Sequence, residues 1–339
     1  MISRIYRLMD TKRIELKLRE LHFTDDSVLI KPEHLAICAA DQRYYLGRRK
    51  REVLRKKLPM ALIHEATGTV LRDYSGKINK GSKVVLLPLE EGNNQAEIKG
   101  NYRTDSTFAS SGVDGFLRDL VLLPPNRVLV INGSYSPIYV FCELLSVALG
   151  AIRMFEKSRQ ISASSFGVWG DGSMGFVMSL VLRCKYPDAK IYVFGKELRK
   201  LIKFSFATES FYIDQVPPEF AVDHAFECVG GAGCEVAIRQ IGDIISPQGV
   251  INLLGVSEQG ISLDTRLVMD KGLQLIGHSR SDKADCKDAL DMICNNKFLQ
   301  KYLQILVSEI IEAKNEDDIY RAFEHDYMND FKTVIKWGI

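Results

Sequence analysis

Four residues in the first half of the chain have side chains that bind metal ions. They are Cys38, the adjacent pair His64 and Glu65, and Glu143, which interrupts an otherwise apolar stretch. A carboxylate in such a stretch is costly to bury unless it is paired or bound to a metal. Thiolate, imidazole and carboxylate together form a reasonable ligand set for zinc. Each residue also has a structural interpretation, as a buried thiol, a core histidine or a helix-end carboxylate, and the sequence spacing alone does not join them.

A glycine pattern near the middle of the chain indicates a second kind of chemistry. An apolar run leads into Gly-Asp-Gly-Ser-Met-Gly, and a further apolar run of helical character follows it. Strand, tight turn and helix in this order are typical of a dinucleotide site, because the helix N-terminus offers unpaired N–H groups to a pyrophosphate. The alternative is an ordinary glycine-rich turn. We expect the cofactor to contact Gly170, Gly172, Ser173, Met174 and Gly175.

The next predicted strand indicates which cofactor is used. Enzymes that use NAD carry an acidic residue near the end of this strand, where it accepts hydrogen bonds from the ribose. Here Gly195 and Lys196 stand at that place, and Lys200 follows. A glycine makes room and lysines pair with a 2′-phosphate, so the sequence favours NADP. The alternative, a solvated helix start, leaves the missing acid unexplained.

Composition limits the possible classes of function. The 339 residues carry a formal net charge of only +2, with 46% hydrophobic and 26% charged residues, so no global charge argues for nucleic acid. The N-terminus shows no signal-peptide pattern, and we expect no stretch that approaches the ~20 apolar residues of a membrane span. The seven cysteines are scattered. This usage predicts reduced thiols in a cytoplasmic protein.

The elements that must position these residues fall into two kinds. Residues 1–135 read as β-rich, with a long loop at 89–111 and a strand at 115–122. From residue 137 strands alternate with helices, which is typical of a parallel doubly wound sheet. The predicted strands there are 164–169, 189–195, 211–213, 222–228, 249–255 and 273–277. The predicted helices are 138–155, 176–182, 196–206, 234–245 and 285–299, and a last strand is expected at 331–337.

The order of these parts resembles the zinc-dependent medium-chain dehydrogenase/reductase family. Cys38, the segment Ile63-His64-Glu65, the segment Lys80-Gly81-Ser82-Lys83-Val84 and the glycine turn fall in family order. The resemblance implies an α/β fold with a GroES-like β-rich catalytic domain and a Rossmann doubly wound parallel-sheet domain. The first would comprise residues 1–137 and 278–339, and the second residues 138–277.

Two sequence motifs narrow the resemblance to one branch of the family. Asp41-Gln42-Arg43-Tyr44-Tyr45 and Val168-Trp169-Gly170-Asp171-Gly172 are unusual in the wider family and are similar to the ribulose-5-phosphate reductases, also called ribitol-5-phosphate dehydrogenases. This implies NADPH-linked reduction of D-ribulose 5-phosphate to D-ribitol 5-phosphate for teichoic acid or capsule synthesis. It also implies a homodimer or homotetramer, in possible association with a ribitol-5-phosphate cytidylyltransferase. An NAD-dependent polyol dehydrogenase and a metal-free, quinone-reductase-like protein are the alternatives.

Carried over by position, the resemblance makes Cys38, His64, Glu65 and Glu143 the ligands of one catalytic zinc, with the two glutamates able to alternate. Two departures stand out. Ile63 replaces the glycine usual before the histidine, and residues 89–111 lack the four cysteines of the structural zinc lobe. We therefore predict one zinc per chain.

Four further residues have predicted roles in the active site. Asp41 is expected either to bond the ligand shell or a substrate hydroxyl, or to cap a turn. Arg43 and Arg49 are the candidates for the substrate phosphate, with Arg118 a weaker one.

Overall fold

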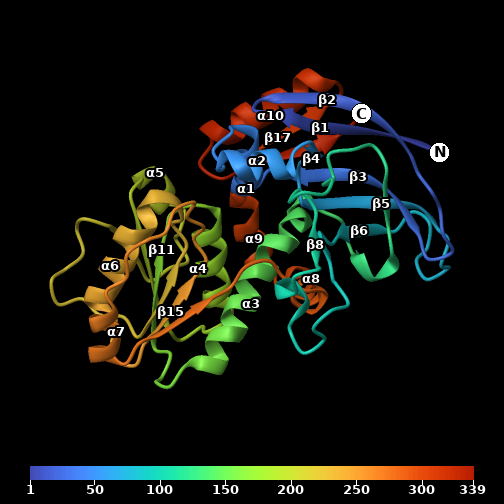
Figure 1. Ribbon diagram of the computed structural model, residues 1–339. Coiled ribbons are helices and arrows are strands. Elements are labelled where there is room, and N and C mark those ends of the chain that lie inside the picture. The colour runs from blue at the N-terminus through green and yellow to red at the C-terminus, as the bar shows by residue number, and fades with distance from the viewer. The chain divides into compact units, whose positions relative to one another are not determined.

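The computed structural model describes all residues 1–339, which divide into two compact units (Figure 1). Unit 1 contains Met1–Ser146 and Arg280–Ile339, and unit 2 contains Val147–Ser279. The first boundary therefore falls inside helix α3 (Cys142–Ser158), nine residues after the one expected from the sequence. The second boundary, where the chain re-enters unit 1, lies two residues after the expected one.

Unit 1 is built mainly of antiparallel sheets. The larger sheet has the order β10-β6-β5-β3-β18-β17, with β9 also paired to β3, and a smaller sheet has the order β2-β1-β4. Its strands are β1 (Ile2–Asp10), β2 (Arg13–Glu20), β3 (Val28–Ala36), β4 (Met60–Ala61), β5 (Glu65–Asp73), β6 (Lys83–Leu86), β7 (Leu89–Glu90), β8 (Thr107–Phe108), β9 (Val121–Leu123), β10 (Val128–Val130), β17 (Val307–Ala313) and β18 (Lys332–Trp337). Its helices are α1 (Ala39–Tyr45), α2 (Arg51–Lys57), α8 (Lys283–Asn295), α9 (Lys297–Leu303) and α10 (Glu316–Met328).

The C-terminal segment completes the first sheet. β18 pairs antiparallel with β3, and β17 pairs parallel with β18, so the red end of the chain lies beside blue N-terminal strands (Figure 1). The pairing buries apolar residues of both segments in one core, which includes Leu35, Ile311, Phe323 and Ile335. Residues 280–339 therefore supply strands that the N-terminal segment needs to close its core.

Three expectations for unit 1 need correction. The strand expected at 115–122 is only β9, because the backbone of Gly115, Phe116 and Leu117 bonds instead to residues 61–63. The region 89–111 is mostly irregular but contains the short β7 and β8 pair. The helix expected at 285–299 is two helices, α8 and α9, separated at Asn296.

Unit 2 is a six-stranded parallel sheet of order β13-β12-β11-β14-β15-β16. Helices lie on both of its faces (Figure 1). The strand order reverses between β11 and β14, and in such sheets ligands bind at the carboxyl ends of the strands beside this reversal. The strands are β11 (Ser165–Trp169), β12 (Lys190–Gly195), β13 (Glu209–Tyr212), β14 (His224–Glu227), β15 (Val250–Leu253) and β16 (Gln274–Gly277). The helices are α4 (Ser173–Lys185), α5 (Leu198–Leu201), α6 (Cys234–Ile244) and α7 (Thr265–Lys271). The expected helix at 196–206 is thus only the short α5.

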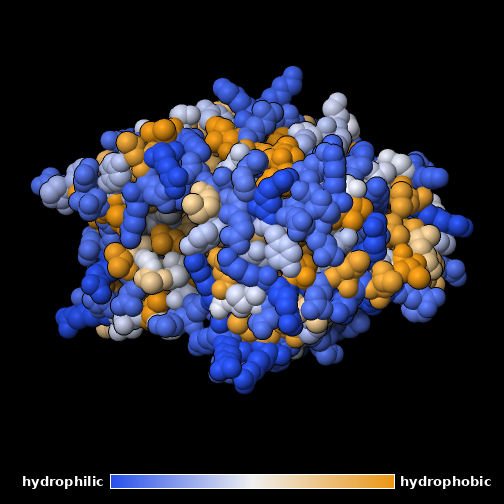
Figure 2. All heavy atoms as spheres, turned by 90° about the horizontal axis from the view of Figure 1, so that it is seen from above, coloured by the Kyte–Doolittle hydropathy of each residue, from blue (hydrophilic) through white to orange (hydrophobic).

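The expectation that no stretch is apolar enough to span a membrane was wrong. The helical stretch Pro137–Ser158 has 22 residues and a mean hydropathy of 1.8 in its most apolar window, which meets the length and composition for one crossing. However, 83% of that window is buried inside the protein, as in the core helix of a soluble fold. Over the face drawn in Figure 2, hydrophilic residues predominate and hydrophobic residues stand in small groups among them.

Candidate metal centre and dinucleotide site

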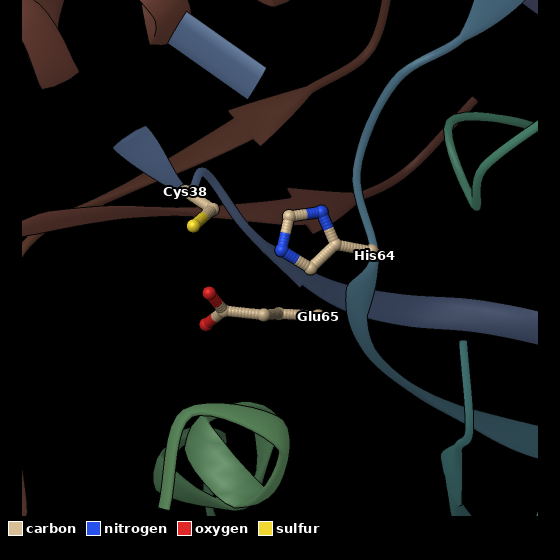
Figure 3. A group of neighbouring side chains, drawn as sticks. All are labelled: Cys38, His64 and Glu65. Carbon is tan, nitrogen blue, oxygen red and sulfur yellow. The ribbon is translucent and has the colours of Figure 1, made fainter. Parts of the chain in front are cut away.

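Three of the four candidate metal ligands meet in unit 1. One ligand atom from each of Cys38, His64 and Glu65 lies within 4.8 Å of the other two, and Figure 3 shows the three side chains directed at one space. Cys38 ends the segment that leaves β3 and stands at the N-cap of α1. Glu65 is the first residue of β5 and pairs with Ala36, the last residue of β3. The pairing of β3 with β5 therefore brings together ligands that the sequence separates.

The residue before the histidine has an unusual backbone. Ile63 has φ 71°, in the left-handed region where a β-branched residue is strained. Its N–H donates to Asp41 Oδ1 at 3.1 Å, and its carbonyl accepts from the N–H of Phe116 at 2.8 Å. A glycine adopts this conformation without strain, which accounts for the family preference at this position. Two hydrogen bonds and full burial hold the isoleucine there and direct His64 toward the cluster.

Asp41 acts both as a cap and as a partner of the histidine. Its fully buried carboxylate accepts from the N–H of Cys38 at 3.1 Å and from Ser110 Oγ at 2.5 Å, and lies 3.4 Å from His64 Nδ1. Burial opposes the charge, but His64, Ser110 and Cys38 together hold the pKa of Asp41 below its usual value. The contact favours a proton on Nδ1 and leaves Nε2 as the donor to a metal.

The charge of Asp41 also acts on the histidine. Burial disfavours the imidazolium, but Asp41 and then Cys38 raise the pKa of His64 well above its ordinary value. Because a metal binds neutral imidazole, a cation bound here must displace a proton.

A buried lysine pairs with Glu65. Lys332, the first residue of β18, donates to Glu65 Oε1 at 2.5 Å and to the carbonyl of Ile37 at 3.2 Å. Both charged side chains are nearly inaccessible to solvent. Glu65 Oε2 is buried without a hydrogen-bond partner, although a buried carboxylate oxygen normally has one. Together with the nearby thiol and imidazole, this orphaned oxygen fits a zinc ion.

Glu143 lies outside this group of three. It is the second residue of α3 and is 6% exposed. Burial, and to a smaller extent the charge of Glu65, raise its pKa to about 7, while His64 and Lys332 oppose the shift. Glu143 therefore interacts electrostatically with the residues of the cluster. Its role as an alternating fourth ligand stays a prediction.

A cation missed by the sequence analysis lies near the cluster. The guanidinium of Arg280 lies 5.1 Å from the centre of the Phe108 ring, and that ring lies 5.4 Å from the ring of His64. Of the earlier candidates, Arg49 lies over the ring of Tyr44 at 4.8 Å, and Arg43 is on α1. Burial lowers the pKa of Arg280, although Tyr44 opposes the shift.

In unit 2 the glycine turn has the geometry of a nucleotide site. Gly170 follows β11 with φ 123°, which favours glycine. A Cβ on Gly175 would collide with the carbonyl oxygen of Gly170, so helix and turn require a glycine there. A Cβ on Gly172 would meet nothing, which leaves open space at the N-terminus of α4, where Ser173 and Met174 follow. These features match the three glycine roles of a dinucleotide turn.

The end of β12 is organised by an acid from the glycine turn. Asp171 accepts from the N–H groups of Lys196 and Glu197 at 2.7 and 2.8 Å. A Cβ on Gly195 would lie 2.6 Å from the Asp171 Cβ, so the glycine has a packing reason beyond making room for a phosphate. Lys200 pairs with Glu197 at 2.8 Å, whereas Lys196 is exposed. Lys196 therefore offers the more available charge of the two lysines.

Sequence reasoning missed Lys332, Ser110, Phe108 and Arg280. Only Lys332 could have been found from the sequence, because it lies within the apolar run Phe331-Lys332-Thr333-Val334. A charged side chain in a buried strand needs a partner of opposite charge. Phe108 ends the short strand β8, whereas Ser110 and Arg280 lie in loops, and the approach of all three to the metal cluster depends on the tertiary fold.

Comparisons with known proteins agree with this geometry. Residues 24–133 match the model of the alcohol dehydrogenase GroES-like domain. The chain is 41% identical over 341 residues to ribulose-5-phosphate reductase of Bacillus spizizenii, with 100% of both chains covered. It is 43% identical to ribulose-5-phosphate reductase 1 of Staphylococcus aureus, with 99% of both chains covered. TarJ of S. aureus, solved in complex with NADPH, superposes with a TM-score of 0.89 at 41% identity over 100% of both chains. The expected fold class, a GroES-like domain with a Rossmann domain, is confirmed.

Proposed function

The chain belongs to the zinc-type medium-chain dehydrogenase/reductase family, in its ribulose-5-phosphate reductase branch, and we propose that it reduces D-ribulose 5-phosphate to D-ribitol 5-phosphate with NADPH. The product would supply ribitol phosphate for activation as CDP-ribitol and for teichoic acid or capsule synthesis. The observation that carries the proposal is the convergence of Cys38, His64 and Glu65 in a chain that is 40–43% identical to four reductases over nearly its full length.

The chain's own groups prepare the reaction. Cys38, His64 and Glu65 would hold zinc, with Glu143 as an alternating ligand, and zinc when bound polarises a ketone carbonyl as a Lewis acid. Asp41 fixes the orientation of His64, and Lys332 holds one oxygen of Glu65. NADPH, when bound, would supply the hydride for the ketone carbon, and the ketone oxygen would take a proton, so that the reduction balances.

The phosphate of the substrate needs a cation. Arg280 lies beside Phe108, next to His64, and its planar guanidinium suits a phosphate. Arg43 and Arg49 remain candidates on the same unit.

The remaining assignments concern the setting of the enzyme. We propose a cytoplasmic homodimer or homotetramer that associates with a ribitol-5-phosphate cytidylyltransferase. All seven cysteines are free thiols, which supports a reducing compartment.

Steady-state kinetics with ribulose and ribulose 5-phosphate, each with NADH and NADPH, test the function. We expect kcat/KM to be highest for the phosphorylated sugar with NADPH. Equal rates on both sugars would favour a polyol dehydrogenase instead. Metal analysis should find one zinc per chain, and Cys38→Ser should abolish turnover while NADPH binding persists. Activity that survives complete zinc removal would contradict the mechanism.

A further inference from the structure

Unit 1 contains a buried arginine whose Nε has no hydrogen-bond partner. The backbone of Arg118 forms an isolated bridge with Ile5 of β1, and only 9% of the residue is exposed. Its Nε is enclosed and has no hydrogen-bond partner. A buried guanidinium is rarely left in this state, because desolvating an unpaired charge is costly.

The nearest acid does not neutralise Arg118. Asp114 accepts two hydrogen bonds from Arg7, at 2.9 and 2.6 Å, and one from the N–H of Ala61 at 2.9 Å. Arg19 lies 3.7 Å from the same carboxylate. Burial first, and then the charges of three neighbouring arginines, lower the pKa of Arg118 to about 10, although Asp114 opposes the shift. The carboxylate is thus shared among several cations.

Arg118 lines a pocket of about 280 Å³. The charged residues around it are Arg19, Arg118 and Arg127 with Glu20, Glu90 and Asp114, and Arg7 stands behind Asp114. Three positive groups thus line the pocket with three negative ones. Glu90 is already paired with Arg127 at 3.3 Å and Asp114 with Arg7 at 2.6 Å, so neither of these acids is reserved for Arg118. No lining residue of this pocket belongs to the metal cluster.

We propose that this pocket is a second anion site, which binds the phosphate group of a small molecule through Arg118. A guanidinium presents its N–H groups as a planar fork that fits phosphate oxygens. Arg19 brings further donors to the same pocket, whereas Arg127 already donates to Glu90 and to the carbonyls of Leu87 and Pro88. The volume suits a small phosphorylated metabolite or free phosphate rather than a nucleotide.

Crystals of the zinc- and NADPH-loaded enzyme soaked in selenate test the assignment directly. Selenate copies the shape of phosphate, and its selenium is located by anomalous scattering. We expect a selenium peak within hydrogen-bond distance of the Arg118 guanidinium. An ordered water there in place of selenate would overturn the proposal, as would a peak that persists unchanged in Arg118→Gln.

Thermal unfolding with NADPH present gives an independent measurement in solution. Inorganic phosphate should raise the Tm of the wild type more than that of Arg118→Leu, by about 2 °C. Arg118→Leu alone should unfold at the same or a higher temperature, because it removes an unpaired buried charge. Arg13→Gln, on the same strand as Arg19 but exposed, is the control and should respond as the wild type does. Equal phosphate shifts in all three proteins, or stabilisation by malonate but not by phosphate, would contradict the proposal.

Discussion

Lys332 Nζ lies 2.5 Å from Glu65 Oε1, with both side chains almost fully buried. The pair holds one carboxylate oxygen and leaves the other for a metal. Lys332→Met should destabilise the zinc-free protein by about 3–5 kcal/mol, because Glu65 would keep an uncompensated buried charge. Bound zinc supplies positive charge at the same carboxylate, so the loss should be smaller in the zinc-loaded protein. Urea unfolding with and without zinc measures both values.

Lys332→Arg is the matched control for this pair. It keeps the charge and should retain part of the stability, although the larger guanidinium must fit the same buried space. Equal losses for Lys332→Met with and without zinc would show that Glu65 does not face the metal.

The left-handed backbone of Ile63 gives a second prediction. At an ordinary position a protein with Gly is less stable than one with Ala by about 1 kcal/mol. At φ 71° we expect the Gly variant to be the more stable one, by a similar amount. Ile63→Gly should therefore be more stable than Ile63→Ala in chemical denaturation. Both variants lose the buried isoleucine side chain, so the difference between their free energies of unfolding reports mainly on the backbone conformation.

Leu62 is the control position, since it is equally buried and is not among the residues with positive φ. Leu62→Gly should be less stable than Leu62→Ala. The same order at both positions would mean that Ile63 is not strained in solution.

Several features of the site were predictable from the sequence because they are local. Gly170 and Gly175 are required by a turn that places a helix and a strand in contact. The glycine pattern of that turn is visible in a short stretch of sequence. Cys38 and Glu65 were recognised by residue type, but their meeting depends on the pairing of β3 with β5. Lys332 lies 267 positions from Glu65, and no periodicity connects them.

The segment 89–111 shows why the rest could not be predicted. It was expected as a loop without a structural metal. In the structure Arg103 donates to the carbonyls of Gly92, Ala96 and Ile98, at 2.8 to 3.2 Å. The guanidinium of Arg103 thus connects three backbone positions of this segment. In many other family members four cysteines and a zinc ion stabilise the corresponding segment. Such a network consists of side-chain to backbone bonds, which leave no periodic trace in the sequence.

Asp326 predicts a pH dependence of stability. Burial, opposed by bonds from Thr333 and Gln42, raises its pKa from 3.8 to about 6. The folded state therefore binds more protons than the unfolded state between these values, and stability falls as pH rises through this window, by about 2 kcal/mol. Asp326→Asn does not titrate, so its urea unfolding free energy should lack this fall from pH 4 to 7, even if its baseline is lower. Parallel pH profiles for both proteins would contradict the assignment.

Lys196 is expected to contact the 2′-phosphate of NADPH. Lys196→Ala should raise KM for NADPH about 10-fold and leave KM for NADH unchanged, because the lost interaction involves only the extra phosphate. Lys200→Ala should have a smaller effect, since Glu197 already pairs with Lys200. Lys190→Ala, exposed at the opposite end of β12, serves as the control. A loss of affinity shared equally by both cofactors would indicate disturbed folding of the strand end.

Arg280 is expected to bind the phosphate of the sugar. Its guanidinium lies over Phe108, which contacts His64, so a phosphate held there would belong to a substrate whose carbonyl reaches the metal. Arg280→Gln should raise KM for ribulose 5-phosphate about 100-fold and leave the slow reduction of ribulose unchanged, because ribulose has no phosphate to bind. Arg48→Gln is the control, since Arg48 is exposed and bonds the Tyr327 hydroxyl at 2.8 Å. Arg43→Gln and Arg49→Gln, measured beside them, rank the other candidates. If Arg280→Gln slowed both sugars equally, Arg280 would act on the metal centre or the fold rather than on the phosphate.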